Sequence, residues 1–525
     1  MDCAAYAIVS RPPWSLRKQM KRITIALAAV CAIPLLIDTA ASESTLNSSL
    51  STGHWIEQGL EQISAERMMV DIKELSSPRF GGRQTGTDHD RESAAFVADR
   101  FSGLRLHRST ASPPESRTNP LPQREWKQTV PVVTKTIQPD PFIQIEDRQP
   151  VLIGPDFLPI LDSPSADIYA AIVFVGYGLS DTAQNIDDYA GLDVRNKIVL
   201  FLRGKPDQYK GAAAHTDKER LAKERGAVAY LTATGPVLSP YELRRGVTGT
   251  PTAFYAGTDG TQQLPGAWIS TAAAESIITL ATAGKGRLMD IQETITRSNT
   301  SRSFATNVTA RLAWTTLSSP GTLFNIASII RGSSPRAQDT VIIGAHRDHF
   351  GVQGGRLFAG ADDNASGTAV MLEVARVLAS APAAPKRSIL FISFSGEEQG
   401  LLGSRHYVSQ PIAPLTSTVG MINIDHAGIG NGRITVGVTG FEKGVAAEAG
   451  QTAGLSDKLD LFGFFPGGDH VPFKEAGVPT VTVVSGGVHP HFHQPTDTAD
   501  TIDPEILKSV ARYVLALAWQ LANAP

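Results

Sequence analysis

Short apolar runs alternate with helix-like segments over the second half of the chain, and this alternation most restricts the possible folds. Runs rich in β-branched and apolar residues predict strands at 324–330, 340–345, 389–395, 419–424 and 480–484. Apolar residues at helical spacing predict helices at 366–379, 442–453 and 505–522. Alternating strands and helices are typical of α/β domains, so we predict a mixed, mostly parallel sheet flanked by helices.

Four of the predicted strands lead directly into residues that can bind a metal ion. These residues are His346, the pair Glu397 and Glu398, Asp425, and the loop that contains His489, His491 and His493. A fifth polar segment, residues 360–367, contains Asp362 and Asp363 and precedes a predicted helix. Each segment alone would be ordinary, but ligands of α/β sheets gather at the carboxyl ends of the strands. Together the five segments therefore predict one metal centre at that edge of the sheet.

The cysteines exclude a thiolate site in the body of the protein. Only Cys3 and Cys31 are present, both within the first 31 residues. Any metal ion must therefore be held by His, Asp and Glu. A donor set of nitrogen and oxygen atoms suits zinc, and it would also accept cobalt or manganese.

The motifs stand in the order found in a known family. They are Ala-His-Arg-Asp-His at 345–349, Gly-Ala-Asp-Asp-Asn-Ala-Ser-Gly at 360–367, Gly-Glu-Glu-Gln-Gly-Leu-Leu-Gly-Ser at 396–404, Asn-Ile-Asp at 423–425, and His-Gln-Pro-Thr-Asp-Thr at 493–498. In these motifs the chain resembles the di-zinc exopeptidase family that holds the bacterial secreted aminopeptidases and the glutamate carboxypeptidases. The resemblance covers nearly all of the chain after its leader.

The resemblance implies a role for each motif residue. One zinc ion would be bound by His346, Asp363 and Asp425, and the other by Asp363, Glu398 and His493, with Asp363 bridging the two. Glu397 would be the general base, and Asp348 would orient the imidazole of His346. Asp362 is the alternative bridging residue, because it is adjacent to Asp363.

One position departs from the family pattern. Many relatives have Tyr directly before the last metal-binding His, and its hydroxyl helps to stabilise the oxyanion. This chain has Phe492 there. Either His489 or His491 supplies the missing hydrogen bond or contacts the substrate, or stabilisation of the oxyanion is weaker in this chain. The alternative for the two histidines is that they are surface residues.

The middle of the chain resembles the protease-associated domain, a small β-rich module often inserted in exopeptidases. The resemblance rests on Asp-Asp-Tyr-Ala-Gly-Leu-Asp-Val at 187–194, followed by Lys-Ile-Val-Leu at 197–200. We therefore expect an N-terminal part of the peptidase domain at 43–149, the inserted protease-associated domain at 150–290, and the main metallopeptidase domain at 291–525.

Residues 1–42 have the order of a signal peptide. Arg17, Lys18, Lys21 and Arg22 precede the almost wholly apolar run 23–37, and small residues follow at 39–42. This order predicts export to the periplasm or the medium, with an uncleaved membrane anchor as the alternative. No other segment reaches 18 apolar residues, so we expect no stable membrane insertion after cleavage. The net charge of −3 argues against a broad nucleic-acid-binding surface, so the expected partners are peptides.

Taken together, these features favour a zinc-dependent exopeptidase, with an aminopeptidase as the leading hypothesis. A carboxypeptidase or dipeptidase of the same family is the nearest alternative, and Arg347 and Arg405 are the arginines closest to the motifs. A glutaminyl cyclase, which uses one zinc ion, and a non-catalytic binding relative are further alternatives. The intact set of ligands speaks against both.

Overall fold

The computed structural model describes residues 55–104, 126–146, 148, 150–151, 154–244, 246–256, 263–298 and 300–525. The predicted signal peptide, residues 1–42, lies outside the described residues. Within the described part of the chain, no helix has both the length and the apolar character that a membrane span requires.

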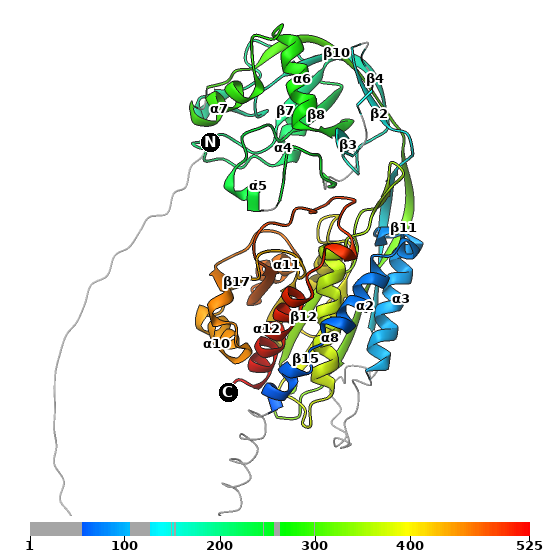
Figure 1. The fold of residues 1–525 in the computed structure, drawn as a ribbon, viewed down its shortest axis with the longest axis vertical. Coiled ribbons are helices and arrows are strands. Elements are labelled where there is room, and N and C mark those ends of the chain that lie inside the picture. The colour runs from blue at the N-terminus through cyan, green and yellow to red at the C-terminus, as the bar shows by residue number, and fades with distance from the viewer. Residues whose placement is uncertain are drawn as a thin grey trace, which may run out of the picture. The chain divides into compact units, whose positions relative to one another are not determined.

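The main sheet has eight strands in a mixed arrangement (Figure 1). In spatial order they are β1 (Trp126–Ile137), β11 (Thr316–Ile330), β15 (Ser388–Phe394), β12 (Thr340–His346), β16 (Thr418–Ile424), β19 (Thr480–Ser485), β17 (Ile434–Thr439) and β18 (Leu459–Phe462). Strands β15, β12, β16 and β19 run parallel, whereas β1, β11 and β17 pair antiparallel with their neighbours β11, β15 and β19. The predicted α/β fold with a mixed sheet is confirmed, although the sequence analysis missed β17 and β18.

Helices cover both faces of this sheet, because side chains along each central strand alternate between two apolar cores. In β12, Val341, Ile343 and Ala345 belong to one core and Ile342 to the other. The larger core is covered by α2 (Ala65–Leu75), α3 (Asp88–Gly103), α8 (Gly367–Ala379), α10 (Lys443–Ala453) and α12 (Pro504–Asn523). The smaller core is covered by α9 (Leu402–Ser409) and α11 (His470–Glu475).

A second, seven-stranded sheet forms the centre of what we call the small module, residues 142–314. In spatial order its strands are β2 (Phe142–Ile145), β10 (Phe304–Trp314), β4 (Ala166–Phe174), β7 (Ile198–Leu202), β8 (Ala229–Ala233), β9 (Gly266–Ile269) and β3 (Phe157–Pro159). Its helices are α4 (His215–Glu224), α5 (Pro240–Arg244), α6 (Thr271–Ala281) and α7 (Leu288–Ser298). Strand β10 pairs in this sheet, although its position in the chain led us to expect it in the main domain.

Two strand pairs stand apart from the large sheets: β5 (Ser180–Asp181) with β6 (Ile186–Asp187), and β13 (Gly351–Gln353) with β14 (Arg356–Phe358). The second pair leads from the end of β12 to the turn at Ala361–Ser366, which precedes α8. It therefore brings the polar 360–367 segment back to the carboxyl edge of the main sheet.

Candidate metal centre

Most of the predicted ligands lie at or just after the carboxyl ends of the four parallel strands, along one edge of the main sheet. His346 ends β12, and Asp425 directly follows β16. Glu397 and Glu398 follow β15 by three and four residues, and His493 lies in the loop after β19. The sequence-based placement of these residues at strand ends is confirmed by the positions of the strands.

One group of ligand atoms forms around His346. Its imidazole Nε2 lies 3.3 Å from Asp363 Oδ1 and 3.3 Å from Asp425 Oδ1. The side chains of His346 and Asp363 are buried, whereas that of Asp425 is 15% exposed. The group is therefore closed by protein on one side and reachable from solvent on the other.

A second group forms around His493. Its Nε2 lies 3.1 Å from Asp363 Oδ2 and 3.5 Å from Glu398 Oε2. Asp363 thus directs one carboxylate oxygen to each imidazole. Ligand atoms placed 2.0–2.1 Å from a tetrahedral zinc ion are about 3.3 Å apart, so both groups have the spacing that zinc requires.

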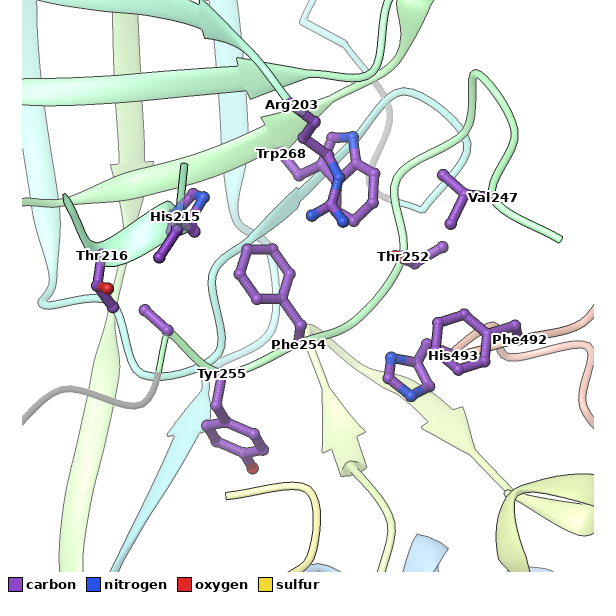
Figure 2. A pocket seen from close by; sticks show the side chains of 12 residues that line it. Arg203, His215, Thr216, Val247, Thr252, Phe254, Tyr255, Trp268, Phe492 and His493 are labelled. Atoms are coloured by element: carbon purple, nitrogen blue, oxygen red, sulfur yellow. The ribbon is translucent and has the colours of Figure 1, made fainter. Parts of the chain in front are cut away.

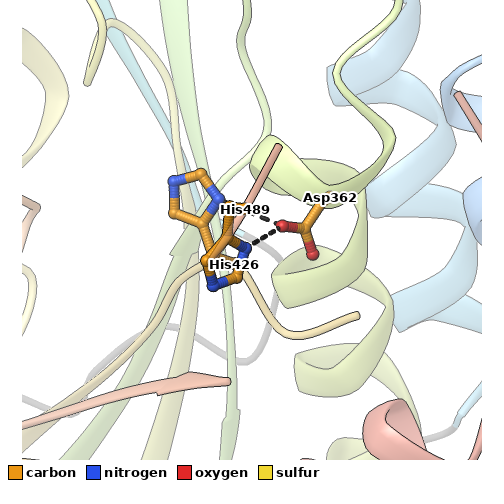
Figure 3. Close-up of side chains that lie close together, drawn as sticks. All are labelled: Asp362, His426 and His489. Atoms are coloured by element: carbon orange, nitrogen blue, oxygen red, sulfur yellow. Dashed lines mark hydrogen bonds and ion pairs between the residues drawn. The ribbon is translucent and has the colours of Figure 1, made fainter. Parts of the chain in front are cut away.

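Asp362 points away from both groups. Its Oδ2 lies 2.6 Å from His489 Nδ1 and 3.2 Å from His426 Nδ1, and Figure 3 shows both imidazoles against this one carboxylate. Its Oδ1 accepts the backbone N–H of Gly428 at 2.8 Å. The geometry therefore favours Asp363 over Asp362 as the shared carboxylate.

Asp348 holds the loop that carries the two glutamates. Its carboxylate accepts the backbone N–H groups of Glu397 at 3.2 Å and Glu398 at 3.4 Å, and the hydroxyl of Thr85 at 3.0 Å. The Nδ1 atom of His346 lies 3.3 Å from the carbonyl oxygen of Asp348 and 3.7 Å from its carboxylate. Asp348 therefore fixes the imidazole through its backbone and the glutamate loop through its side chain.

Glu397 lies beside the ligand groups without belonging to either. Burial raises the pKa of its carboxyl well above the ordinary value, and the negative charges of Asp425 and Asp469 raise it further. Burial likewise raises the pKa of Glu398, and the charges of Asp363 and Glu397 add to the effect. So many carboxylates at one point create the negative potential that favours a divalent cation.

His349 is a site residue that the sequence analysis missed. Its Nδ1 atom lies 2.8 Å from Glu398 Oε1, which leaves Oε2 to face His493. The side chain of His349 is fully buried. Its position in the Ala-His-Arg-Asp-His motif, one residue after Asp348, is the signal that could have identified it.

The two histidines predicted to contact the substrate or the oxyanion, His489 and His491, lie in different surroundings in the structure. His491 bonds to the hydroxyl of Thr496 at 2.9 Å on the exposed side of its loop. His489 is buried, with Nδ1 at Asp362 and Nε2 3.0 Å from the carbonyl oxygen of Ser485. The structure therefore brings His489 to the Asp362 side of the centre and does not bring His491 to it.

Arg83 ties together the loops that carry the ligands, and sequence analysis missed this role too. The guanidinium is fully buried and donates to the carbonyl oxygens of Leu75, Arg347, Ala359 and Gly360 at 2.5–2.7 Å. Of these residues, Arg347 directly follows His346, and Gly360 directly precedes the turn that contains Asp363. Arg83 therefore fixes the distance between two segments that meet at the centre.

Comparison with known proteins confirms the resemblance stated from the motifs. Residues 325–518 match Peptidase family M28. Aminopeptidase YwaD of Bacillus subtilis (strain 168) is 33% identical over 207 residues, which cover 37% of this chain and 44% of that protein. A probable leucine aminopeptidase of Arthroderma otae is 34% identical over 214 residues, covering 38% of this chain and 58% of that protein. The chain thus matches about half the length of these curated relatives.

The fold has a solved counterpart over most of its length. An aminopeptidase from Aneurinibacillus sp. strain AM-1 aligns with a TM-score of 0.63 at 23% identity, covering 90% of this chain and 96% of that one. This similarity extends beyond residues 325–518, so the general fold of both sheets is shared with that structure.

Proposed function

We propose that the chain is a zinc-dependent aminopeptidase with two zinc ions, proceeding from the match of residues 325–518 to peptidase family M28. The observation that carries the proposal is the position of Asp363 between two imidazoles. Its Oδ1 faces His346 at 3.3 Å and its Oδ2 faces His493 at 3.1 Å. A carboxylate shared in this way is the ligand that a pair of metal ions needs.

The donor atoms suit two zinc ions. His346, Asp363 and Asp425 would hold one, and Asp363, Glu398 and His493 the other. Each set has imidazole nitrogen and carboxylate oxygen only, which zinc accepts in tetrahedral sites with an open position. Cobalt and manganese would also fit this donor set. When bound, the ions would polarise the scissile carbonyl and lower the pKa of the attacking water.

Glu397 would act as the general base. Its carboxylate belongs to neither ligand group, so it would be available to accept a proton from water and return it to the leaving amine. Asp348 holds the backbone of Glu397, so the carboxylate stays beside the ligand groups during both transfers. Glu398, held by His349, is directed toward His493 instead.

Aminopeptidase activity is favoured over carboxypeptidase activity by the positions of the two candidate arginines. Arg347 is buried and bonded to Asp90 at 2.7 Å, and Arg405 pairs with Glu475 on the surface. Neither guanidinium reaches the centre to bind a substrate carboxylate. Both curated relatives described above are named as aminopeptidases, which supports the same activity here.

We also propose export and the module assignment made from the sequence. Residues 1–42 would be removed as a signal peptide, and N-terminal sequencing of protein from an exporting host should begin near residue 43. A chain that retains residues 23–37 would instead be membrane-anchored. The small module would be a protease-associated domain.

Two conservative variants test the division of roles between the glutamates. Glu397→Gln should retain metal and fold but lower kcat by about 10²–10⁴-fold on an aminoacyl-nitroanilide, because Gln cannot accept the proton. Glu398→Gln should lose part of the bound zinc, and added zinc should partly restore activity. Glu475→Gln, an exposed glutamate outside the centre, is the control.

Metal analysis tests the assignment of the bridge. Asp363→Ala should lose both zinc ions, and His493→Ala should lose mainly one. If Glu397→Gln loses metal while Glu398→Gln only slows turnover, the two roles are reversed. Wild-type protein that binds zinc but hydrolyses neither aminoacyl-nitroanilides nor N-blocked peptides would instead be a binding relative.

A further inference from the structure

The predicted ligand His493 is supported differently from the ligands at strand ends. His346 ends β12 and Asp425 directly follows β16, so the main sheet itself fixes both residues. His493 lies in a loop well beyond Ser485, the last residue of β19. Its φ of +54° is in the left-handed region, which few residues with a side chain adopt. Such a conformation persists only where its surroundings hold it, so His493 needs support beyond that of β19.

The small module supplies this support through hydrogen bonds. The backbone N–H of Ala253 donates to the carbonyl oxygen of His493 at 3.0 Å, and His493 Nδ1 lies 2.7 Å from the carbonyl oxygen of Ala253. The side-chain amide of Gln494, the next residue of the loop, donates to the carbonyl oxygen of Pro251 at 2.8 Å. Figure 2 shows the module segment that carries Phe254 next to the loop that carries His493. These three hydrogen bonds join the two segments.

The contact at Nδ1 determines which ring nitrogen of His493 can bind a metal ion. A carbonyl oxygen only accepts hydrogen bonds, so Nδ1 carries a hydrogen. In the neutral ring the lone pair is then on Nε2, which faces Asp363 Oδ2 at 3.1 Å and Glu398 Oε2 at 3.5 Å. Metal-binding histidines are typically oriented in this way, and loss of the outer partner lowers metal affinity by about 10–100-fold. Ala253 therefore acts on the second zinc site through His493.

Aromatic side chains extend the contact between the module and the ring of His493. Phe350 directly follows His349, yet it is fully buried in the apolar core of the small module. Its ring packs edge-on against His493 at a centroid distance of 4.6 Å and lies 5.8 Å from the ring of Tyr255. The hydroxyl of Tyr255 accepts the side-chain amide of Gln84 at 3.1 Å. The imidazole of His493 therefore contacts both a carbonyl oxygen and the apolar core of the module.

One glycine of the module shows how closely the two segments approach. Gly246 has a φ of +69°, and a Cβ atom there would lie 2.0 Å from the carbonyl oxygen of His489. A side chain at this position would push the loop of His489 and His493 away from the module. Gly284 of the same module has a φ of +78°, but among the described residues no atom beyond its chain neighbours lies within 4 Å of a Cβ placed there. The two glycines therefore separate the close approach from backbone strain.

We propose that the small module is a positioning element for His493, and that its contact with this loop and zinc binding at the second site stabilise each other. The inference rests on the proposed two-zinc centre. Coupling between two equilibria is reciprocal, so a contact that raises zinc affinity is strengthened by zinc to the same extent. The hydrogen bonds of Ala253 and Gln494 would then form most completely when zinc is bound. The ligands His346 and Asp425 are fixed by strand ends instead, so the first site should depend far less on the module.

The first experiment titrates the zinc-loaded full chain with a competing chelator. Gly246→Ala should weaken the second site by about 10–100-fold and leave the first nearly unchanged, because the loop with His493 loses its contact with Ala253. Gly284→Ala introduces the same methyl group at a similar φ, so it is the matched control and should bind both zinc ions like wild type. Gln494→Met keeps the length of the side chain but removes the donor, and it should weaken the second site by a smaller factor.

The second experiment measures hydrogen–deuterium exchange of the full chain with and without zinc. Zinc should slow the exchange of residues 252–255, because it strengthens their contact with the loop of His493. Helix α7 (Leu288–Ser298) is the control within the same module and should exchange equally in both states. Gly246→Ala should lose the zinc-dependent protection of residues 252–255, whereas Gly284→Ala should retain it. A purely structural role of these residues would not make their exchange depend on zinc.

The outcomes separate this inference from the proposed function. Zinc-dependent protection of residues 252–255 in a protein that hydrolyses no aminoacyl-nitroanilide would overturn the aminopeptidase assignment and retain the coupling. Hydrolysis together with wild-type zinc affinities in Gly246→Ala and Gln494→Met would overturn the coupling and retain the enzyme. Weakening of both sites by the same factor, or equal exchange of residues 252–255 with and without zinc, would also overturn the coupling.

Discussion

The buried ion pair between Asp90 and Arg347 should be among the most sensitive points for stability. Arg347 Nη2 donates to Asp90 Oδ1 at 2.7 Å, and both side chains have no solvent exposure. The guanidinium also donates to Ser93 Oγ and to the carbonyl oxygens of Ser393 and Phe394. Asp90→Ala would leave a charged guanidinium in a dry interior. Removing one partner of a buried pair costs about 3–5 kcal/mol, so we expect this loss in the free energy of unfolding.

A double variant removes both charges of the ion pair. Asp90→Leu combined with Arg347→Met buries no ion, and apolar replacements of a buried pair are often neutral or stabilising. Urea unfolding followed by circular dichroism would give the free energy for wild type, Asp90→Ala and the double variant. We expect the double variant to recover more than half of the loss. A loss below about 1 kcal/mol for Asp90→Ala, or a double variant no better than the single one, would refute this reasoning.

Three further predictions follow from contacts around the centre and in the small module. Arg83→Met should weaken zinc binding by about 10–100-fold in a chelator competition, because the loops with His346 and Asp363 lose their common partner. His349→Phe should weaken zinc binding by a similar factor, mainly at the second site, because Glu398 loses its orienting hydrogen bond. Burial lowers the pKa of His215 to about 3 from an unfolded value near 6.5, so the unfolded chain binds more protons between these values. Stability should therefore fall by about 1.5 kcal/mol from pH 6.5 to pH 5, and His215→Phe should reduce this loss in thermal unfolding.

The central strands and the ligands at their ends could be predicted from sequence because both are local patterns. Residues 341–345 are apolar residues and one glycine, and all seven residues of β12 are buried between two helical layers. In an α/β sheet the functional residue lies at the carboxyl end of such a strand. His346, the last residue of β12, could therefore be found without knowing any contact. Asp425 could be found in the same way, because it directly follows β16.

Residues that act through distant partners could not be found in this way. Arg347 stands in a ligand motif and was considered as a substrate-binding residue, yet its partner Asp90 lies 257 positions earlier. Arg83 acts through carbonyl oxygens, which have no sequence signature. His493 is held by the carbonyl oxygen of Ala253, 240 residues away in the chain, and no local pattern indicates that they meet.

The two acidic doublets show why neighbouring carboxylates cannot substitute for each other. In each doublet one side chain faces the imidazoles of the metal ligands and the other turns elsewhere: Asp363 faces His346 and His493, whereas Asp362 faces His489. Burial opposes ionisation of Asp362, but the charges of His489 and His426 and their hydrogen bonds together outweigh burial and hold the pKa of this carboxyl below its usual range. Asp362 therefore already has a partner and cannot rotate to replace Asp363 without leaving His489 unpaired. A carboxylate lost from one position of a doublet is not replaced by its neighbour, even though the sequence places both within 4 Å along the backbone.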